Sequence, residues 1–236
     1  MKRVVIAGNR RIEYILFQTA RKNVLFQALP EGVTRVYAPK YMRLRDIDEM
    51  VRQRAEELSE IHRSIDHRLE EDRKNHPVSE GSTLMVEGVP HVLRLRPGKP
   101  VRALCESGEY LLTLPAPGSD PEVRAAIRST LSVRALERIR SRVNHYAPLM
   151  GVHPGRIAIR DQKSRWGSCS SKGNLNFNWK LIMAPPQVLD YVVIHELCHL
   201  LEFNHSPRFW QLVYARMPDY EAWKKWLKLH ADDLYM

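Results

Sequence analysis

A pair of histidines four residues apart, inside an apolar run, constrains this chain more than any other feature. His195 and His199 enclose Glu196 in an H-E-x-x-H pattern, and most residues between 188 and 201 are aliphatic or aromatic. A helix that is apolar on nearly every side is buried, and residues four apart project from one helical face. Since buried imidazoles need polar partners, the pattern predicts two metal ligands rather than two ordinary core histidines. Glu196, one residue further round the helix, is suited to act as a general base.

A catalytic zinc site needs a third protein ligand and one open position. His205 is the favoured candidate, because Asn204 can end the helix and the Ser-Pro pair after His205 resembles the start of the next one. In such a tight joint His205 can point back at the first helix. Two carboxylates remain alternatives, Glu202 on the same helix and Glu221 further downstream.

The segment ahead of that helix has the pattern of a β-hairpin. Residues 160–169 precede a Ser-Ser-Lys-Gly turn, and residues 174–179 then alternate between asparagine and large apolar side chains. Strict alternation is typical of a strand with one buried face. We expect the first strand to line the substrate cleft, with Lys163, Arg165 and Trp166 as candidate substrate contacts. Solvated basic side chains are the alternative interpretation.

The rest of the chain mixes short strands with long helices, so the fold class is α+β. The predicted elements are strands at 12–17, 24–26 and 33–37, one long helix over 45–74, a small β-meander between 82 and 118, and a helix over about 120–146. We expect two regions, an N-terminal β-rich region with one long helix, residues 1–118, and a hydrolase core, residues 119–236.

The charge balance is basic but not concentrated. The 236 residues include 37 basic and 27 acidic side chains, for a net charge of +10, and the excess is spread along the chain. Such a distribution favours anionic partners only weakly. Five arginines of the expected helix over 120–146 share one broad arc, which we interpret as a solvated face, with a nucleic-acid-binding stripe as the alternative. They are Arg124, Arg128, Arg134, Arg138 and Arg142.

Cysteine content and hydropathy indicate the compartment. Three cysteines with no C-x-x-C pair indicate reduced thiols rather than a disulfide framework. No apolar run approaches the roughly 20 residues that span a bilayer, and the apolar stretch after the basic N-terminal tip is too short for a signal peptide. The sequence therefore predicts a cytoplasmic protein with no membrane partner.

Three segments of the last third carry a specific combination of motifs. Residues 159–171 contain Arg-Trp-Gly-Ser-Cys, residues 191–199 contain the H-E-x-x-H pattern, and residues 204–210 read Asn-His-Ser-Pro-Arg-Phe-Trp. Together they resemble the YgjP-like family of metal-dependent hydrolases, which is related to the SprT-like and WLM zinc proteases. The resemblance implies a zincin-like core in which the three histidines hold one zinc ion and Glu196 is the catalytic base. The family is usually labelled metallopeptidase, and some members are described as pyrophosphatases acting on UTP.

Three functions compete on this basis, and a zinc-dependent peptidase ranks first. The second is a nucleoside triphosphate pyrophosphohydrolase with Lys163 and Arg165 as phosphate contacts, although the chain has no Gly-rich phosphate loop. The third is a nucleic-acid-associated protein with structural zinc, which would require four protein ligands and would leave Glu196 without a role.

Overall fold

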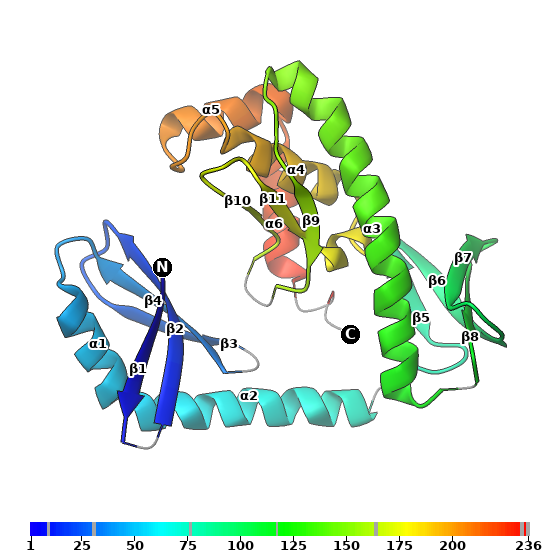
Figure 1. Ribbon diagram of the computed structural model, residues 1–236, viewed down its shortest axis with the longest axis horizontal. Coiled ribbons are helices and arrows are strands. Elements are labelled where there is room, and N and C mark those ends of the chain that lie inside the picture. Colours follow the sequence, from blue (N-terminus) through cyan, green and yellow to red (C-terminus); the bar gives the residue numbers. More distant parts are fainter. Residues whose placement is uncertain are drawn as a thin grey trace. The chain divides into compact units, whose positions relative to one another are not determined.

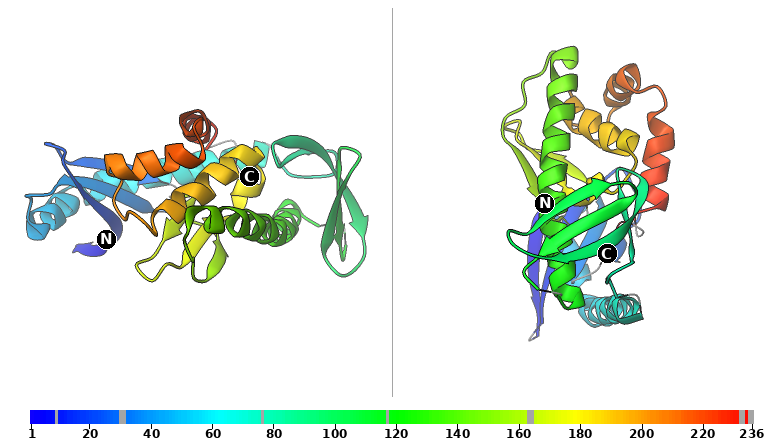
Figure 2. Two further views of the ribbon diagram at one scale, coloured as in Figure 1. Left: turned by 90° about the horizontal axis from the view of Figure 1, so that it is seen from above. Right: turned by 90° about the vertical axis from the view of Figure 1, so that its right-hand side faces the viewer.

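The computed structural model describes residues 1–8, 10–29, 32–75, 77–116, 118–162, 165–231 and 234 (Figures 1 and 2). The chain forms two compact units, Met1–His76 and Pro77–Met236. Within the described residues, six α-helices and three small sheets make a mixed α+β structure. No helix of this part of the chain is long and apolar enough to cross a membrane.

The first unit is a four-stranded sheet followed by two helices. The strands run in the order β1-β2-β4-β3, with β2 and β4 parallel and the outer pairs antiparallel. Alternate side chains of the central strands are buried with apolar residues of the helices, as expected for a sheet with one covered face. The elements are β1 (Lys2–Ala7), β2 (Arg10–Thr19), β3 (Leu25–Leu29), β4 (Val33–Pro39), α1 (Leu44–Gln53) and α2 (Ala55–Asn75).

The single long helix predicted over 45–74 is wrong, because the chain breaks at Arg54. This residue leaves the helical conformation, with φ −99° and ψ 12°, and its guanidinium lies 4.8 Å from the centre of the Phe26 ring. The break lets α1 pack against β1 and α2 against β3. Apolar spacing alone continues across the break, since Val51, Ala55 and Leu58 are all buried.

The second unit begins with another four-stranded sheet, which is not the predicted meander. Its strand order is β5-β6-β8-β7, and β6 and β8 pair in parallel. Strand β8 buries every second residue, whereas β7 has no buried residue, so the more apolar strand occupies the interior of the sheet. The elements are β5 (Thr83–Val86), β6 (Val89–Pro97), β7 (Arg102–Glu106) and β8 (Glu109–Leu114).

A 31-residue helix, α3 (Asp120–Met150), links this sheet to the rest of the unit. Glu122 accepts a hydrogen bond of 2.8 Å from the Ser119 backbone N–H at the helix start, and Gly151 ends the helix with φ 64°. Leu93 and Leu112 of the sheet belong to the same buried cluster as α3. The domain boundary predicted between residues 118 and 119 therefore falls inside one hydrophobic core. The division between the two compact units lies along the sequence between residues 76 and 77.

The remaining elements surround α4, and Figure 1 shows the third sheet alongside this helix. The sheet order is β10-β11-β9, with β10 antiparallel and β9 parallel to β11. Helix α4 contacts α3, α5, α6 and β10. The elements are β9 (Ile157–Arg160), β10 (Gly167–Cys169), β11 (Leu175–Asn178), the 3-10 turn η1 (Trp179–Ile182), α4 (Pro186–Cys198), α5 (Pro207–Arg216) and α6 (Tyr220–Leu229).

The hairpin of β10 and β11 agrees with the sequence pattern, but its first strand is shorter than predicted. The expected strand over 160–169 is divided, since β9 ends at Arg160 and β10 begins at Gly167. Strand β9 instead pairs with the far side of β11, which leaves β10 at the sheet edge. Alternation along one strand cannot show which neighbour it pairs with, because pairing depends on residues distant in sequence.

Candidate metal centre

Three histidines converge at the end of α4. His195 lies in the last turn of that helix, His199 follows its final residue, and His205 directly precedes the Ser206 cap of α5. One ring nitrogen from each histidine lies within 4.8 Å of the other two. Nε2 of His195 and Nε2 of His205 are 3.0 Å apart. The structure therefore brings together the three residues that the sequence pattern indicates as metal ligands.

Local backbone structure explains this convergence. After α4 the chain makes a tight turn in which the N–H groups of Leu201 and Glu202 both donate to the carbonyl of Cys198. The Ser206 hydroxyl then accepts a 3.3 Å hydrogen bond from the Phe209 N–H and starts α5. Only five residues separate His199 from His205, so the two helix ends hold the rings close together.

The ring nitrogens available to a cation follow from the hydrogen bonds. Nδ1 of His199 lies 3.3 Å from the backbone carbonyl of Glu202, so Nδ1 carries the proton and Nε2 is free to bind. The backbone oxygen of Glu202 thus accepts a hydrogen bond from His199. Among the described residues, the cluster of groups that could bind a metal contains neither Glu202 nor Glu221. Nδ1 of His195 is buried and has no hydrogen-bond partner among the described residues.

The surroundings keep the three imidazoles neutral. The Phe209 ring is fully buried, and its centre lies 4.7 to 4.9 Å from the centres of all three histidine rings. Burial lowers the pKa of His195 to about 3, with smaller contributions from His199, His205 and Lys224. Burial also lowers the pKa values of His199 and His205. Three neutral imidazoles that face one point make a donor set suited to a divalent transition metal such as zinc.

Glu196 lies beside this cluster with its carboxylate buried. Only 5% of the residue is exposed, and the N–H of Cys169 in β10 donates a hydrogen bond to the carboxylate. Burial raises the pKa of Glu196 to about 8, while the positive charge of Arg165 and the Cys169 N–H act in the opposite direction. Oε2 has no hydrogen-bond donor in the described part of the chain. This oxygen is therefore the position at which the carboxyl can hold or release a proton.

The predicted substrate contacts have different environments. Lys163 lies outside the described residues, so its predicted role stays a prediction. Arg165 is exposed, and its charge acts on Glu196. Trp166 is half-buried, packs against the main hydrophobic core, and accepts a 2.8 Å hydrogen bond at its carbonyl from the Asn178 N–H. The structure thus gives Trp166 a packing role at the start of the hairpin.

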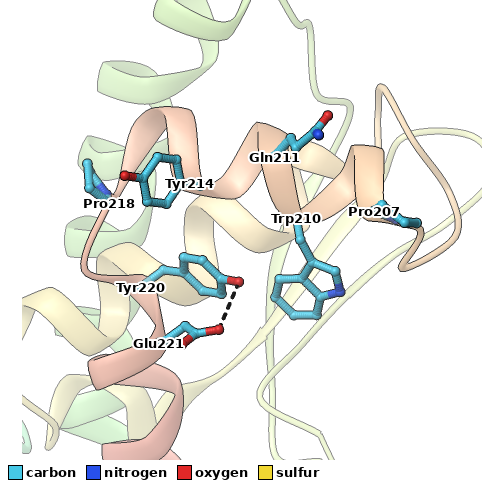
Figure 3. A pocket seen from close by; sticks show the side chains of 7 residues that line it. All are labelled: Pro207, Trp210, Gln211, Tyr214, Pro218, Tyr220 and Glu221. Atoms are coloured by element: carbon cyan, nitrogen blue, oxygen red, sulfur yellow. Dashed lines mark hydrogen bonds between the residues drawn. The ribbon is translucent and has the colours of Figure 1, made fainter.

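An aromatic groove beside the cluster was not anticipated from the sequence. The indole ring of Trp210 stacks at 5.7 Å on His205 and at 5.4 Å on Tyr220, the distances joining ring centres. The sequence signal near it is that all five tryptophans lie in residues 166–226, a pattern that by itself indicates a dense core rather than a groove. Figure 3 shows the groove, which has a volume of about 560 Å³ and is lined by Pro207, Trp210, Gln211, Tyr214, Pro218, Tyr220 and Glu221.

The arginine arc of α3 is neither a plain solvated face nor a stripe of unpaired cations. Each of the five arginines forms an ion pair with a carboxylate of its own helix or of another segment of the same unit. The pairs are Arg124–Asp120, Arg128–Asp161, Arg134–Glu87, Arg138–Glu87 and Arg142–Asp190. The nucleic-acid alternative gains no support from this helix.

Comparison with known proteins gives a match to a protein family. The family model described as YgjP-like, metallopeptidase domain, matches residues 22–230. Among solved structures, the chain is similar to the crystal structure of the metallopeptidase zymogen of Pyrococcus abyssi abylysin. That similarity has 20% identity and a TM-score of 0.36, and it covers 40% of this chain and 93% of the other. None of the curated proteins compared with the chain matches it.

Proposed function

The chain belongs to the YgjP-like metallopeptidase family and is a metal-dependent hydrolase, and from this premise we propose that it cleaves peptide bonds with one zinc ion. In this proposal His195, His199 and His205 hold the zinc in a zincin-like core, and Glu196 is the general base. The observation that carries the proposal is the convergence of three neutral imidazoles beside a buried carboxylate whose Oε2 has no donor in the described residues.

Three neutral imidazoles are a ligand set that fits zinc, and a catalytic zinc site with three protein ligands would have its fourth position for water or substrate. A zinc ion held there would supply a Lewis acid that polarises the scissile carbonyl and lowers the pKa of water to roughly 7. His199 contributes Nε2, because its Nδ1–H is bound to the carbonyl of Glu202. Phe209 packs against all three rings, which fixes their positions and excludes solvent from one side of the cluster.

Glu196 has the environment of a proton carrier. Burial raises its pKa to about 8, which keeps the carboxyl mainly protonated near neutral pH as long as no cation is close. A divalent cation at the histidines would lower this pKa, because opposite charges favour the ionised carboxylate. We assign Oε2 as the atom that takes the proton from the attacking water and passes it to the leaving amine.

The edge of β10 is the proposed binding surface for the peptide backbone. This strand is the outer member of its sheet, with β11 on one side, and it contacts α4, which carries Glu196. An extended peptide can add to such an edge through backbone hydrogen bonds. The groove beside Trp210 is the proposed place for a substrate side chain, since the indole ring contacts His205 directly.

A nucleotide substrate is the second candidate. The observation that favours it is the exposed guanidinium of Arg165, whose charge acts at Glu196 and which a polyphosphate would be attracted to. Neither the family match nor the ion-paired arginines of α3 add support for a nucleotide or a nucleic acid. We therefore rank the peptidase first.

The test uses purified protein with one zinc per chain, incubated with a quenched-fluorescent peptide library and separately with nucleoside triphosphates. We expect peptide cleavage that a chelator abolishes and added zinc restores. Glu196→Gln should keep the zinc and lose about 100- to 10,000-fold in turnover, since the amide preserves shape but cannot accept the proton. Hydrolysis of UTP with no peptide cleaved by the zinc-loaded protein would reverse the ranking.

A further inference from the structure

The proposed base lies directly against a glycine of the neighbouring sheet. A Cβ atom added to Gly167 would lie 2.5 Å from Glu196 Oε1, 2.7 Å from its Cγ and 2.9 Å from its Cδ. Contacts this short do not occur for real Cβ atoms, because they are far inside the van der Waals distance between carbon atoms. Any side chain at this position would therefore have to displace the Glu196 carboxylate.

The backbone itself does not require glycine here. Gly167 is the first residue of β10, pairs opposite Phe177, and is not among the glycines with a left-handed backbone conformation. Alanine adopts such a strand conformation without strain. The conflict with Glu196 is thus the reason that the position needs glycine.

The same strand also holds the carboxylate by a hydrogen bond. Cys169 is two residues after Gly167, so the two residues present their backbone groups on the same side of the strand. The intervening Ser168 is opposite Asn176 of β11, and the N–H of Cys169 donates to Glu196. Strand β10 therefore contacts Glu196 at two points. The Cys169 N–H donates to the carboxylate, and the carboxylate occupies the space that a side chain at Gly167 would fill.

We propose that Gly167 is a positioning residue for the hydrolytic reaction, because its missing side chain forms the seat in which the Glu196 carboxylate rests against β10. The seat binds the carboxylate on the Cys169 side and leaves Oε2 without a donor among the described residues. This inference rests on the proposed role of Glu196 as general base. The seat itself is a statement about packing and can be tested without any activity.

The first test is a stability cycle on the zinc-loaded full chain. Gly167→Ala should lower Tm by several degrees, because the added methyl group collides with a buried carboxylate. In the Glu196→Ala background the same substitution should cost little, since the colliding atoms are gone. An equal loss of Tm in both backgrounds would overturn the proposal, and this comparison holds even if Gly167→Ala folds poorly.

The second test follows the hydrogen bond to Cys169. Amide hydrogen exchange at Cys169 should speed up at least about tenfold in Gly167→Ala, because the displaced carboxylate no longer accepts from this N–H. Glu196→Ala should produce the same change. Slow exchange at Cys169 in a folded Gly167→Ala protein would contradict the seat, whatever substrate the enzyme cleaves.

Activity gives the third test, with a matched control. In Gly167→Ala we expect kcat to fall about 100-fold with KM and zinc content little changed, the loss expected for a misplaced catalytic group. Gly155→Ala is the control, because its Cβ would lie 2.8 Å from Asn174 Oδ1, a close contact at a second glycine that does not involve Glu196. A similar fall of kcat in both variants would contradict a specific role for Gly167. If no peptide is cleaved by the wild type, the proposed function fails, while the exchange and stability tests still decide the seat.

Discussion

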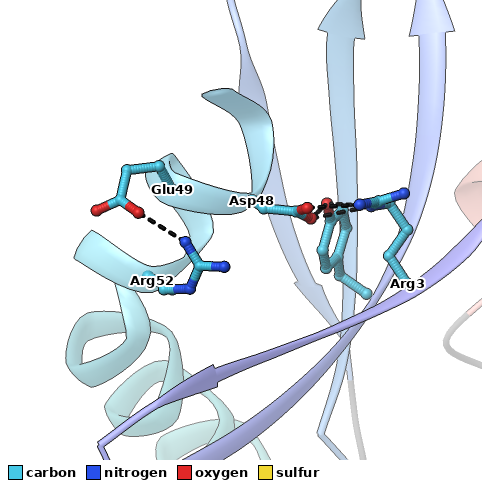
Figure 4. Close-up of polar contacts among 5 residues, drawn as sticks. Arg3, Asp48, Glu49 and Arg52 are labelled. Atoms are coloured by element: carbon cyan, nitrogen blue, oxygen red, sulfur yellow. Dashed lines mark hydrogen bonds and ion pairs between the residues drawn. The ribbon is translucent and has the colours of Figure 1, made fainter. Parts of the chain in front are cut away.

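Among single residues, three hydrogen-bonded side chains join strands β1 and β2 to helix α1, and Figure 4 shows their contacts. Asp48 Oδ1 accepts hydrogen bonds from Arg3 Nε at 2.9 Å and from the Tyr14 hydroxyl at 2.6 Å. The bond with Arg3 holds the pKa of Asp48 below its usual value, and the bond with Tyr14 acts in the same direction. Burial, followed by the contact with Asp48, raises the pKa of Tyr14 to about 12. The network is therefore an ionised carboxylate held by two donors.

This network predicts a pH-dependent contribution to stability. Because the folded pKa of Asp48 is depressed, its contribution is present above the unfolded pKa, about 3.9, and is lost as pH falls through the folded pKa. We expect Asp48→Asn to cost about 1.5–3 kcal/mol at pH 7 and progressively less below about pH 4. Urea unfolding of wild type and variant across pH 3 to 7 measures the difference.

The matched control lies one residue away on the same helix. Glu49 pairs with Arg52 at 2.6 Å, but both side chains are about half exposed. Glu49→Gln should cost less than about 1 kcal/mol at pH 7, because exposed ion pairs contribute little. A loss of unfolding free energy in Asp48→Asn that stays constant down to pH 3 would contradict the pH dependence. A loss equal to that in Glu49→Gln would show that Asp48 contributes no more than an exposed ion pair does.

Among the elements, helices α3 and α4 share a hydrophobic core and are also joined by a half-buried polar contact. Arg142 of α3 donates from Nε to Asp190 Oδ1 at 2.6 Å and from Nη2 to Oδ2 at 2.9 Å. The hydroxyl of Tyr146, one turn along α3, donates to the same carboxylate at 3.0 Å. Such a two-pronged arginine–carboxylate pair fixes both distance and orientation. It therefore helps to hold the helix that carries His195 and Glu196.

We expect Asp190→Asn to lower the free energy of unfolding by about 1.5–3 kcal/mol, since a charged hydrogen-bonded pair is broken away from bulk solvent. Zinc stoichiometry should stay at one, because Asp190 lies outside the histidine cluster. Arg128→Gln is the comparison, and its more exposed pair with Asp161 should contribute less than about 1 kcal/mol. Equal losses of unfolding free energy in the two variants would argue against a special role for the contact.

The elements also show what sequence can and cannot predict. Helices α3 and α4 follow from local apolar residues and from start signals such as Pro121 and Pro186. The break at Arg54 and the strand orders do not, because they depend on contacts between distant segments. The same distinction applies to the site, since the three histidines span eleven residues, whereas the seat at Gly167 requires β10 to pack on α4.

On the scale of the whole molecule, each of the two compact units has its own hydrophobic cluster. One cluster lies entirely within residues 1–76, and the other, with the histidine site, lies entirely within residues 77–236. A unit that buries its own core can in general fold alone. The histidine cluster therefore belongs to the second unit in both sequence and packing.

A fragment of residues 77–236 should consequently fold and bind one zinc per chain. We expect a single cooperative thermal transition by circular dichroism and the same zinc stoichiometry as the full chain, because every residue of the site and its core is present. The His199→Ala fragment serves as the control that should lose the metal. A fragment that is unfolded in the presence of zinc would mean that the first unit is required for the core to form.

In the proposed function, three histidines and one open position form a catalytic zinc centre. X-ray absorption at the zinc edge of the fully loaded protein tests it most directly. We expect three imidazole nitrogens at about 2.0–2.1 Å from the zinc and one oxygen ligand that does not come from the protein. A sulfur ligand from one of the cysteines, or a fourth protein ligand that closes the site, would contradict it.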